Sequence, residues 1–346
     1  MSIALDVGVS QMRSLRRRRF RLVGRNCRSS YAALPDSPIR RRVLDEGRVP
    51  YAVCEDSLIM LGDLVSEFAW LFHVPSVPLL PAGDVPHDDP PARQAIAAII
   101  DALLPEPQAP KEHCCLSISG LPDRRSPAGH ESLDFLTQVV RLRGYVPSIL
   151  SSTRAVVLAE LVGEAFSGIG MIFGAGSCEI GLVHCGLEIA RCTVPVGGNW
   201  IDEQIARRDA SYFWDSAGHK YLNTDTATAW KEAFAGSLLE PASAQERVLC
   251  ELYQDLITRA LTEACQTFSA VLEVADVPQP VSVVCSGGAA SISGFCELLT
   301  RSIQKTPLPV AVKQVTVAGD SRYTVARGCL IHAELYSETP SLNRVA

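Results

Sequence analysis

Short apolar runs and glycine turns recur in the same order in two parts of the chain. The first part has an apolar segment at residues 2–8, a turn, and an arginine-rich run that leads to a further strand, with Gly24 expected in a hairpin turn. Residues 168–194 repeat this plan with a strand, a glycine turn at 174–177, a second strand, a turn at Gly186 and a third strand. The repetition predicts an internal structural duplication.

Helical and strand-like periods alternate in the rest of the chain. A helix, a strand and a second helix are predicted in turn over residues 92–144, which is typical of an α/β fold. Residues 201–273 are predicted to be almost wholly helical, and their last helix starts at a capping box formed by Ser243 and Glu246. A strand, a Ser-Gly-Gly turn and a helix follow over 280–304, before a final strand and helix.

Composition and charge restrict the class of protein without naming a ligand. The chain has 346 residues, 47% of them hydrophobic, which is enough for two domains. Its formal net charge of −6 lacks the global basic character of most nucleic-acid-binding proteins, and its 12 scattered cysteines contain no CxxC pair that would indicate zinc. The most hydrophobic stretch, residues 57–81, is interrupted by acids and prolines, which favours a buried helix and loop over a membrane span. We therefore expect a cytoplasmic protein with no transmembrane segment.

Four glycine-containing turns adjoin predicted strands and are the candidates for a ligand site. They are DVGVS at Asp6, GAGSCE at Gly174, VGGNWIDE at Gly197 and CSGGAAS at Gly287. Glycine at such turns lets backbone amides approach a phosphate closely, and the last turn leads into a helix whose N-terminal dipole favours an anion. Each turn alone is weak evidence, whereas the order and spacing of the set is more specific.

The set resembles the actin-like ATPase superfamily, which includes actin, the bacterial actin MreB, the heat-shock chaperone ATPases and the sugar kinases. ALDVGVS is similar to its first phosphate loop, IFGAGSCEIGLV to its second and VVCSGGAASISGF to its adenosine loop, while VPVGGNWIDEQI is nearest to MreB and the chaperones. The resemblance implies an α/β fold of two duplicated actin-like (ribonuclease H-like) domains facing a central nucleotide cleft. It also implies a reduced, mainly helical outer subdomain in domain II. The boundaries we predict are 1–147 plus 324–336 for domain I, 148–323 for domain II and 337–346 for a flexible tail.

The resemblance implies that ATP or ADP binds in the cleft with Mg²⁺. Asp6 matches the carboxylate that holds the hydrated magnesium through water, and Lys231 lies where the family often has a polar residue near the adenine and ribose. The residues implied in nucleotide binding are Asp6, Gly8, Ser10, Gly174, Gly176, Ser177, Glu179, Gly197, Gly198, Lys231, Ser286, Gly287, Gly288 and Ala289.

Several positions depart from the family pattern. Its acidic positions fall on Ile172, before the second phosphate loop, and on Ser152, where the family places a glutamate that positions attacking water. Ala175 replaces a glycine, and Val9 replaces a threonine whose hydroxyl Ser10 partly supplies. Hydrolysis in this family depends on positioning and charge stabilisation, so we expect a weak ATPase at most, with its catalytic residues unknown.

The arginine-rich segment from Arg13 to Arg28 permits two interpretations. It is either a basic surface for an anionic partner, such as RNA, an anionic membrane or an acidic protein, or a solvated hairpin in an arginine-biased chain.

Three hypotheses about function remain open. The first is an MreB-like adenine-nucleotide-binding protein in which closure of the cleft controls assembly or partner binding. The alternative is a pseudo-ATPase scaffold that binds no nucleotide and acts through protein–protein interaction. A small-molecule kinase is a third, for which the sequence offers no catalytic base with matching context.

Overall fold

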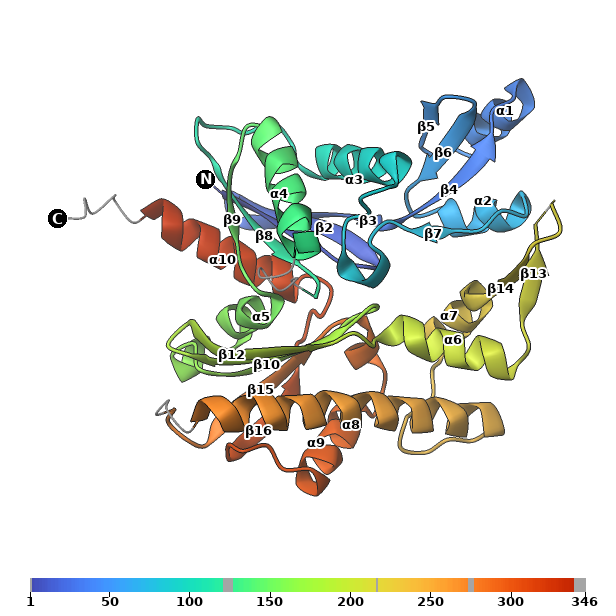
Figure 1. The fold of residues 1–346 in the computed structure, drawn as a ribbon. Helices are drawn as coiled ribbons and strands as arrows, with labels where there is room; N and C mark the ends of the chain where they lie inside the picture. The colour runs from blue at the N-terminus through green and yellow to red at the C-terminus, as the bar shows by residue number, and fades with distance from the viewer. Residues whose placement is uncertain (1, 121–126, 216, 273–276, 339–346) are drawn as a thin grey trace.

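A computed structural model describes residues 2–120, 127–215, 217–272 and 277–338. Two five-stranded sheets lie one above the other with helices between and outside them (Figure 1). The first sheet has the order β3-β2-β1-β8-β9. Its strands are β1 (Ser2–Val7), β2 (Gln11–Arg18), β3 (Arg21–Arg28), β8 (His113–Ile118) and β9 (Val146–Ile149).

The second sheet repeats the first, with the order β12-β11-β10-β15-β16. In both, the first three strands form an antiparallel meander and the last two run parallel to the central strand. This repetition confirms the predicted duplication and the actin-like fold class. The strands are β10 (Gly168–Phe173), β11 (Cys178–His184), β12 (Leu187–Val194), β15 (Val281–Ser286) and β16 (Val312–Val317).

Helices α5 (Ser152–Glu160) and α10 (Thr324–Glu338) lie between the two sheets and pack on each other (Figure 1). They share a hydrophobic cluster with Ala4 of β1, Cys115 of β8 and Ile172 of β10. Because β1 and β10 are central strands covered on both faces, all their residues are buried. The two halves are therefore joined by a continuous apolar layer.

Four further helices cover the outer faces of the sheets. Helices α3 (Pro90–Leu103) and α4 (Pro127–Leu142) pack on the first sheet, and α8 (Ala244–Leu272) and α9 (Phe295–Lys305) pack on the second. At the start of α8, Ser243 Oγ accepts from the Glu246 amide at 3.2 Å, as the predicted capping box requires. Glu246 Oε2 accepts at 2.8 Å from the amide of Ala242, one residue before the N-cap.

The two outer subdomains differ. The first has a four-stranded sheet with its own apolar core, and within residues 57–81 it combines β6 and α2 rather than the predicted buried helix and loop, with Trp70 73% exposed. Its elements are β4 (Ser30–Pro35), α1 (Pro38–Glu46), β5 (Tyr51–Cys54), β6 (Ser57–Leu61), α2 (Val65–Leu71) and β7 (Val77–Pro78). No helix in the described ranges is long and apolar enough to cross a membrane.

The second outer subdomain is mainly helical, as predicted, with α6 (Gly198–Arg208) and α7 (Thr224–Glu232). The prediction of helix through residue 214 is wrong, because β13 (Tyr212–Trp214) pairs with β14 (Lys220–Leu222) and Phe213 stacks on Tyr221. Short 3₁₀ helices complete the fold: η1 (Pro81–Gly83), η2 (Val162–Glu164) and η3 (Gly288–Ser291).

Two further expectations concern a turn and the tail. The β2–β3 turn lies at Arg19 and Phe20, and Gly24 is inside β3, where the ring of Tyr323 approaches it so closely that a Cβ would stand 2.6 Å from Cε1. Gly24 is therefore required for packing and not for a turn. Of the tail predicted for 337–346, α10 includes the first two residues, and the rest lies outside the described residues.

Candidate functional site

The turns after β1 and β10 meet between the two halves. The first turn is closed by a hydrogen bond from the Gly8 amide to the Gln11 carbonyl at 3.1 Å, while the Ser10 carbonyl accepts from the Ser29 amide at 2.9 Å. A Cβ built on Gly176 would stand 3.0 Å from Cγ2 of Val9, so the second turn lies directly against the first. The predicted phosphate loops are thus brought together, with an alkyl side chain between them.

The segment at Gly197 is attached to the second turn. The Gly198 amide donates to the Gly174 carbonyl at 2.9 Å, and the Asn199 amide donates to the Ala175 carbonyl at 2.8 Å. A Cβ on Gly197 would stand 2.6 Å from both of these carbonyl oxygens. The first amides of α6 are therefore satisfied within the chain, and Gly197 serves close backbone packing.

The turn after β15 packs on the same loop. Gly287 has φ +103°, and a Cβ there would stand 2.3 Å from the Phe173 carbonyl oxygen, so only glycine fits. At Gly288 no atom lies within 4 Å of where a Cβ would be, whereas Ala289 is 7% exposed. Ser286 Oγ donates to the Ser321 carbonyl at 3.3 Å. Gly288 is the position of this turn that is open to a ligand.

Lys231 is held in an ion pair that the sequence did not reveal. Its Nζ lies 2.6 Å from Asp202 Oδ1 and donates to the Gly198 carbonyl at 2.8 Å. Asp202 is 2% exposed, and burial raises the pKa of its carboxyl although Lys231 and Thr228 act to lower it. The sequence does not predict this pair, because Asp202 lies on α6 and its partner Lys231 lies on the separate helix α7.

Asp6 is 8% exposed at the end of β1, and its nearest charged partner is Arg13, directly opposite in β2. Arg13 Nη1 lies 3.7 Å from Asp6 Oδ2. Burial raises the pKa of Asp6 to about 6, and Arg13 opposes this shift. A hydrated cation at Asp6 would therefore have to share the carboxylate with a guanidinium group.

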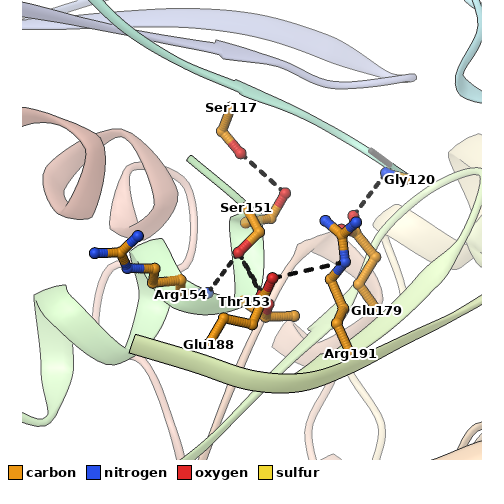
Figure 2. Close-up of polar contacts among 9 residues, drawn as sticks. Ser117, Gly120, Ser151, Thr153, Arg154, Glu179, Glu188 and Arg191 are labelled. Atoms are coloured by element: carbon orange, nitrogen blue, oxygen red, sulfur yellow. Dashed lines mark hydrogen bonds and ion pairs between the residues drawn. The ribbon is translucent and has the colours of Figure 1, made fainter. Parts of the chain in front are cut away.

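Glu179, fully buried on β11, supplies the second carboxylate of the site (Figure 2). Its Oε1 accepts from the Gly120 amide at 2.7 Å, which links the turn after β8 to the second half. Burial raises the pKa of Glu179 to about 7, while the Gly120 amide and Arg191 act to lower it. The Glu179 carboxyl is therefore poised to exchange a proton near neutral pH.

Three buried polar atoms beside the second turn have no hydrogen-bond partner among the residues that the structure describes. They are Glu179 Oε2, Ser177 Oγ and Arg191 Nη1. Most buried polar atoms in proteins are paired, so a group of such atoms in one region indicates a place for a polar ligand, an ion or water. Sequence reasoning had found Ser177 and Glu179 but missed Arg191, which comes from β12.

The two uncharged residues predicted to occupy the family's acidic positions have structural partners. Ile172 is 6% exposed in the apolar layer between the sheets, and it lies directly opposite Glu179 in the β10–β11 pair. Ser152 Oγ lies 3.0 Å from Ser117 Oγ of β8. A carboxylate thus remains one strand away from Ile172, on the same face of the sheet.

Glu188 brings another carboxylate to the start of α5 (Figure 2). Its Oε1 accepts from Ser151 Oγ at 2.5 Å and from Thr153 Oγ1 at 2.8 Å, and its Oε2 lies 3.9 Å from Arg191 Nε. Glu188 stands beyond a β-bulge between Leu182 and Val183. Counting residues along the chain cannot place it opposite α5, because the bulge shifts the register. Within the described ranges no group of three or more His, Cys, Asp or Glu side chains could hold a metal ion by itself.

Comparisons with solved structures agree with this architecture. The chain is similar to a MamK double helical filament, with a TM-score of 0.67 and 18% identity over 98% of this chain and 100% of that chain. It is also similar to MreB5 of Spiroplasma citri bound to AMPPNP, with a TM-score of 0.64 and 16% identity over 97% of this chain and 96% of that one. A non-polymerising MamK mutant bound to AMPPNP has a TM-score of 0.55 and 18% identity over 96% of this chain and 98% of that chain.

At these identities the likeness shows the fold alone, which is actin-like. The search of curated proteins found no match. The sequence pattern of one family, Volactin, matches residues 1–333, nearly the whole of the two-halved fold described above. The chain therefore belongs to the Volactin family.

Proposed function

We propose that the chain is a cytoplasmic, actin-like protein that binds an adenine nucleotide between its two halves, and that closure around the nucleotide controls self-association or partner binding. Residues 1–147 with 324–336 and residues 148–323 would be the two moving bodies. Solved structures of similar fold are bound to AMPPNP or ADP, and one is a filament. The closing motion would change the contact between Val9 and Gly176, where the two halves touch.

The observation that carries the proposal is the group of unpartnered buried atoms beside the second turn. Arg191 Nη1 and Ser177 Oγ are donors suited to phosphate oxygens, and Glu179 Oε2 is an acceptor suited to the water shell of Mg²⁺. The residues present thus fit a nucleotide phosphate with its cation. When bound, Mg²⁺ would neutralise phosphate charge. Asp6 would hold the magnesium water only after loosening its pair with Arg13.

Turnover in this proposal is weak or absent. Neither Ile172 nor Ser152 supplies a carboxylate, and Glu188 is already held by two hydroxyls. Loss of one group that positions or stabilises the reacting atoms commonly costs about two to four orders of magnitude in rate. A nucleotide would therefore act mainly as a long-lived conformational ligand.

A non-binding scaffold remains the second candidate, because two observations favour it. The Val9 side chain lies against Gly176 between the phosphate loops, and the first amides of α6 are already donated to Gly174 and Ala175. With these contacts the halves pack on each other without a ligand. The two candidates differ in a single measurable property, which is stabilisation by nucleotide.

The test is the thermal midpoint with and without millimolar Mg-ATP, Mg-ADP and Mg-AMPPNP. A ligand at about 100 times its dissociation constant adds about 2.7 kcal/mol, which raises the midpoint by several degrees. We expect a shift with all three ligands. No shift with any of them would leave the scaffold.

A matched pair of variants locates the ligand. At both Gly288 and Gly163 an added side chain would enter open space. Gly288→Glu would introduce a bulky anion at the open position of the adenosine loop, whereas Gly163→Glu makes the same change at η2. We expect the first to abolish the shift and the second to keep it. Equal shifts in both variants would place the nucleotide elsewhere.

A further inference from the structure

The arginines of the β2–β3 hairpin fall into two classes. Toward its base, five of them contact the rest of the chain. Arg16 is 3% exposed and pairs with buried Glu112, which fixes β2 to the edge of the core. The five contacts are Arg13 with Asp6, Arg16 with Glu112, Arg17 with Glu334, Arg25 with the Ala102 carbonyl and Arg28 with Ser66.

The tip of the hairpin is different. Arg18, Arg19 and Arg21 are exposed, and their side chains make no hydrogen bond or ion pair within the described part of the chain. Phe20, between them, is 101% exposed, so its ring contacts nothing. Together with the exposed Leu22 and Val23, Phe20 forms an apolar patch rimmed by unpaired arginines, which is typical of an interaction site.

The apolar surface of the tip extends to more than one face. Leu22 and Val23 are 49% and 42% exposed, and neighbouring residues of a strand point to opposite faces. A flat protein surface could cover only one of these faces. An apolar medium that the tip enters would cover Phe20, Leu22 and Val23 together.

The hairpin segment itself carries charge of one sign, and the acid Glu334 beside it is paired with Arg17. No acidic residue occurs between Asp6 and Asp36 in the sequence, although the whole chain has a net charge of −6. A positive tip on a negative molecule would orient it toward an anionic surface. Guanidinium groups bind phosphate through paired hydrogen bonds, and an aromatic ring is favoured at the boundary between head groups and acyl chains.

We propose that the tip formed by Arg18, Arg19, Phe20 and Arg21 docks on an anionic lipid bilayer, with the phenylalanine ring among the acyl chains and the arginines on lipid phosphates. RNA fits the tip less well than a bilayer does. Phe20 can stack on a base, but the aliphatic side chains of Leu22 and Val23 cannot. One such tip binds reversibly and weakly, and several tips in an assembly bind tightly through multivalency. The inference does not depend on nucleotide binding.

The experiment is flotation of the full chain with phosphatidylcholine vesicles that contain or lack phosphatidylserine. Replacing Arg18, Arg19 and Arg21 with glutamine removes three charges near the surface, and we expect the partition coefficient on anionic vesicles to fall about 100-fold. Phe20→Ser should lower it about tenfold on the same vesicles. The matched control replaces the exposed Arg48, Arg141 and Arg301 with glutamine, removing the same charge elsewhere, and should retain binding.

The same variants decide between lipid and nucleic acid. Anisotropy of a fluorescent single-stranded RNA should change equally little for the tip variant and the control variant. The proposal is overturned if wild type does not float with anionic vesicles, if both triple variants lose lipid binding alike, or if the tip variant loses RNA binding while keeping lipid binding. Circular dichroism checks that every variant is folded.

Discussion

The hairpins β2–β3 and β11–β12 occupy equivalent places in the two sheets but have opposite surroundings. In the second half, α8 covers β12, and the hairpin tip is tied back by the Gly186 amide to the Phe166 carbonyl at 2.9 Å and by the Cys185 amide to Ser167 Oγ at 2.9 Å. In the first half, Arg18, Arg19, Phe20 and Arg21 extend into solvent. One backbone plan thus carries a buried polar site in one copy and a free surface in the other.

The charges at the bases of the two hairpins are exchanged as well. In the first half the acid Asp6 is the penultimate residue of the central strand and lies opposite Arg13 of β2. In the second half Ile172 has this position and lies opposite the acid Glu179 of β11. Cross-strand partners share a face, so each half still presents one carboxylate to the space between the sheets. The carboxylate is thus on the central strand β1 in the first half and on the neighbouring strand β11 in the second.

The largest expected effect concerns equivalent positions on the two hairpins. Arg16 of β2 lies opposite Ile3, and Leu182 of β11 lies opposite Ile169. Ile3 and Ile169 are equivalent, because they precede Asp6 and Ile172 by three residues. Arg16→Ala leaves Glu112 buried without its partner and should lower the free energy of unfolding by about 3–5 kcal/mol. Leu182→Ala should cost about 2–5 kcal/mol through the cavity it creates. Urea denaturation measures both.

A second substitution should restore the free energy of unfolding in one of these variants but not in the other. Adding Glu112→Gln should recover part of the loss in the Arg16→Ala variant, because it removes the uncompensated charge. The same change should not help Leu182→Ala. Equal responses of the two backgrounds would show that the Arg16–Glu112 pair is not what anchors the hairpin.

A smaller effect is expected at the turns after the equivalent strands β8 and β15. Gly287→Ala places a Cβ 2.3 Å from the Phe173 carbonyl oxygen at φ +103°, and we expect a loss of about 3 kcal/mol or more. Gly120→Ala, at φ +66° with Ser177 Oγ 3.4 Å away, should lose only the left-handed backbone cost of about 1–2 kcal/mol. Thermal unfolding compares the two variants. A reversed order would mean that the first turn is the tighter one.

Much of the fold follows from local patterns. The two glycine-punctuated meanders, the alternation of helix and strand and the capping box of α8 are signals contained in a few neighbouring residues. The β2–β3 turn was misplaced because Arg19 adopts the left-handed conformation, with φ +53°, that usually indicates glycine. The strand β13 was missed because three aromatic residues in a helical context form a strand only by pairing with β14.

The candidate site was only partly predictable for a related reason. Glycine turns are visible in the sequence, so the loops at Gly8, Gly174, Gly197 and Gly287 could be listed. Arg191 is brought to the site by its register with β11, and a further shift at the bulge places Glu188 at α5. Residues that meet through the pairing register of two strands show no local pattern in the sequence.

The next prediction separates the two carboxylates by pH. Folding raises the pKa of Glu179 from 4.5 to about 7, so its stabilising contribution is complete below about pH 4.5 and is lost as pH rises through 7. A shift of this size corresponds to about 3 kcal/mol, at about 1.4 kcal/mol per pKa unit. Glu179→Gln keeps an oxygen for the Gly120 amide and should be more stable than wild type at about pH 8, with a flatter profile.

Asp6 provides the internal comparison. Its pKa is raised from 3.8 to about 6, so the contribution of Asp6 is lost as pH rises through 6, earlier than that of Glu179. Urea denaturation at several pH values should therefore show Asp6→Asn differing from wild type in slope mainly below about pH 6, and Glu179→Gln differing up to about pH 7.5. Indistinguishable profiles would mean that the two carboxyls titrate as one unit.

The smallest effect is expected at the two hairpin tips in the absence of lipid. Phe20 contacts nothing, so Phe20→Ser should change the free energy of unfolding by less than about 0.5 kcal/mol. Leu187, 62% exposed beside a tip that is tied back, still buries part of its side chain, so Leu187→Ser should cost somewhat more. Urea denaturation of both variants in lipid-free buffer measures the difference. A loss above about 1 kcal/mol for Phe20→Ser would mean that the ring packs on the protein in solution, which would remove the reason for assigning it to a membrane.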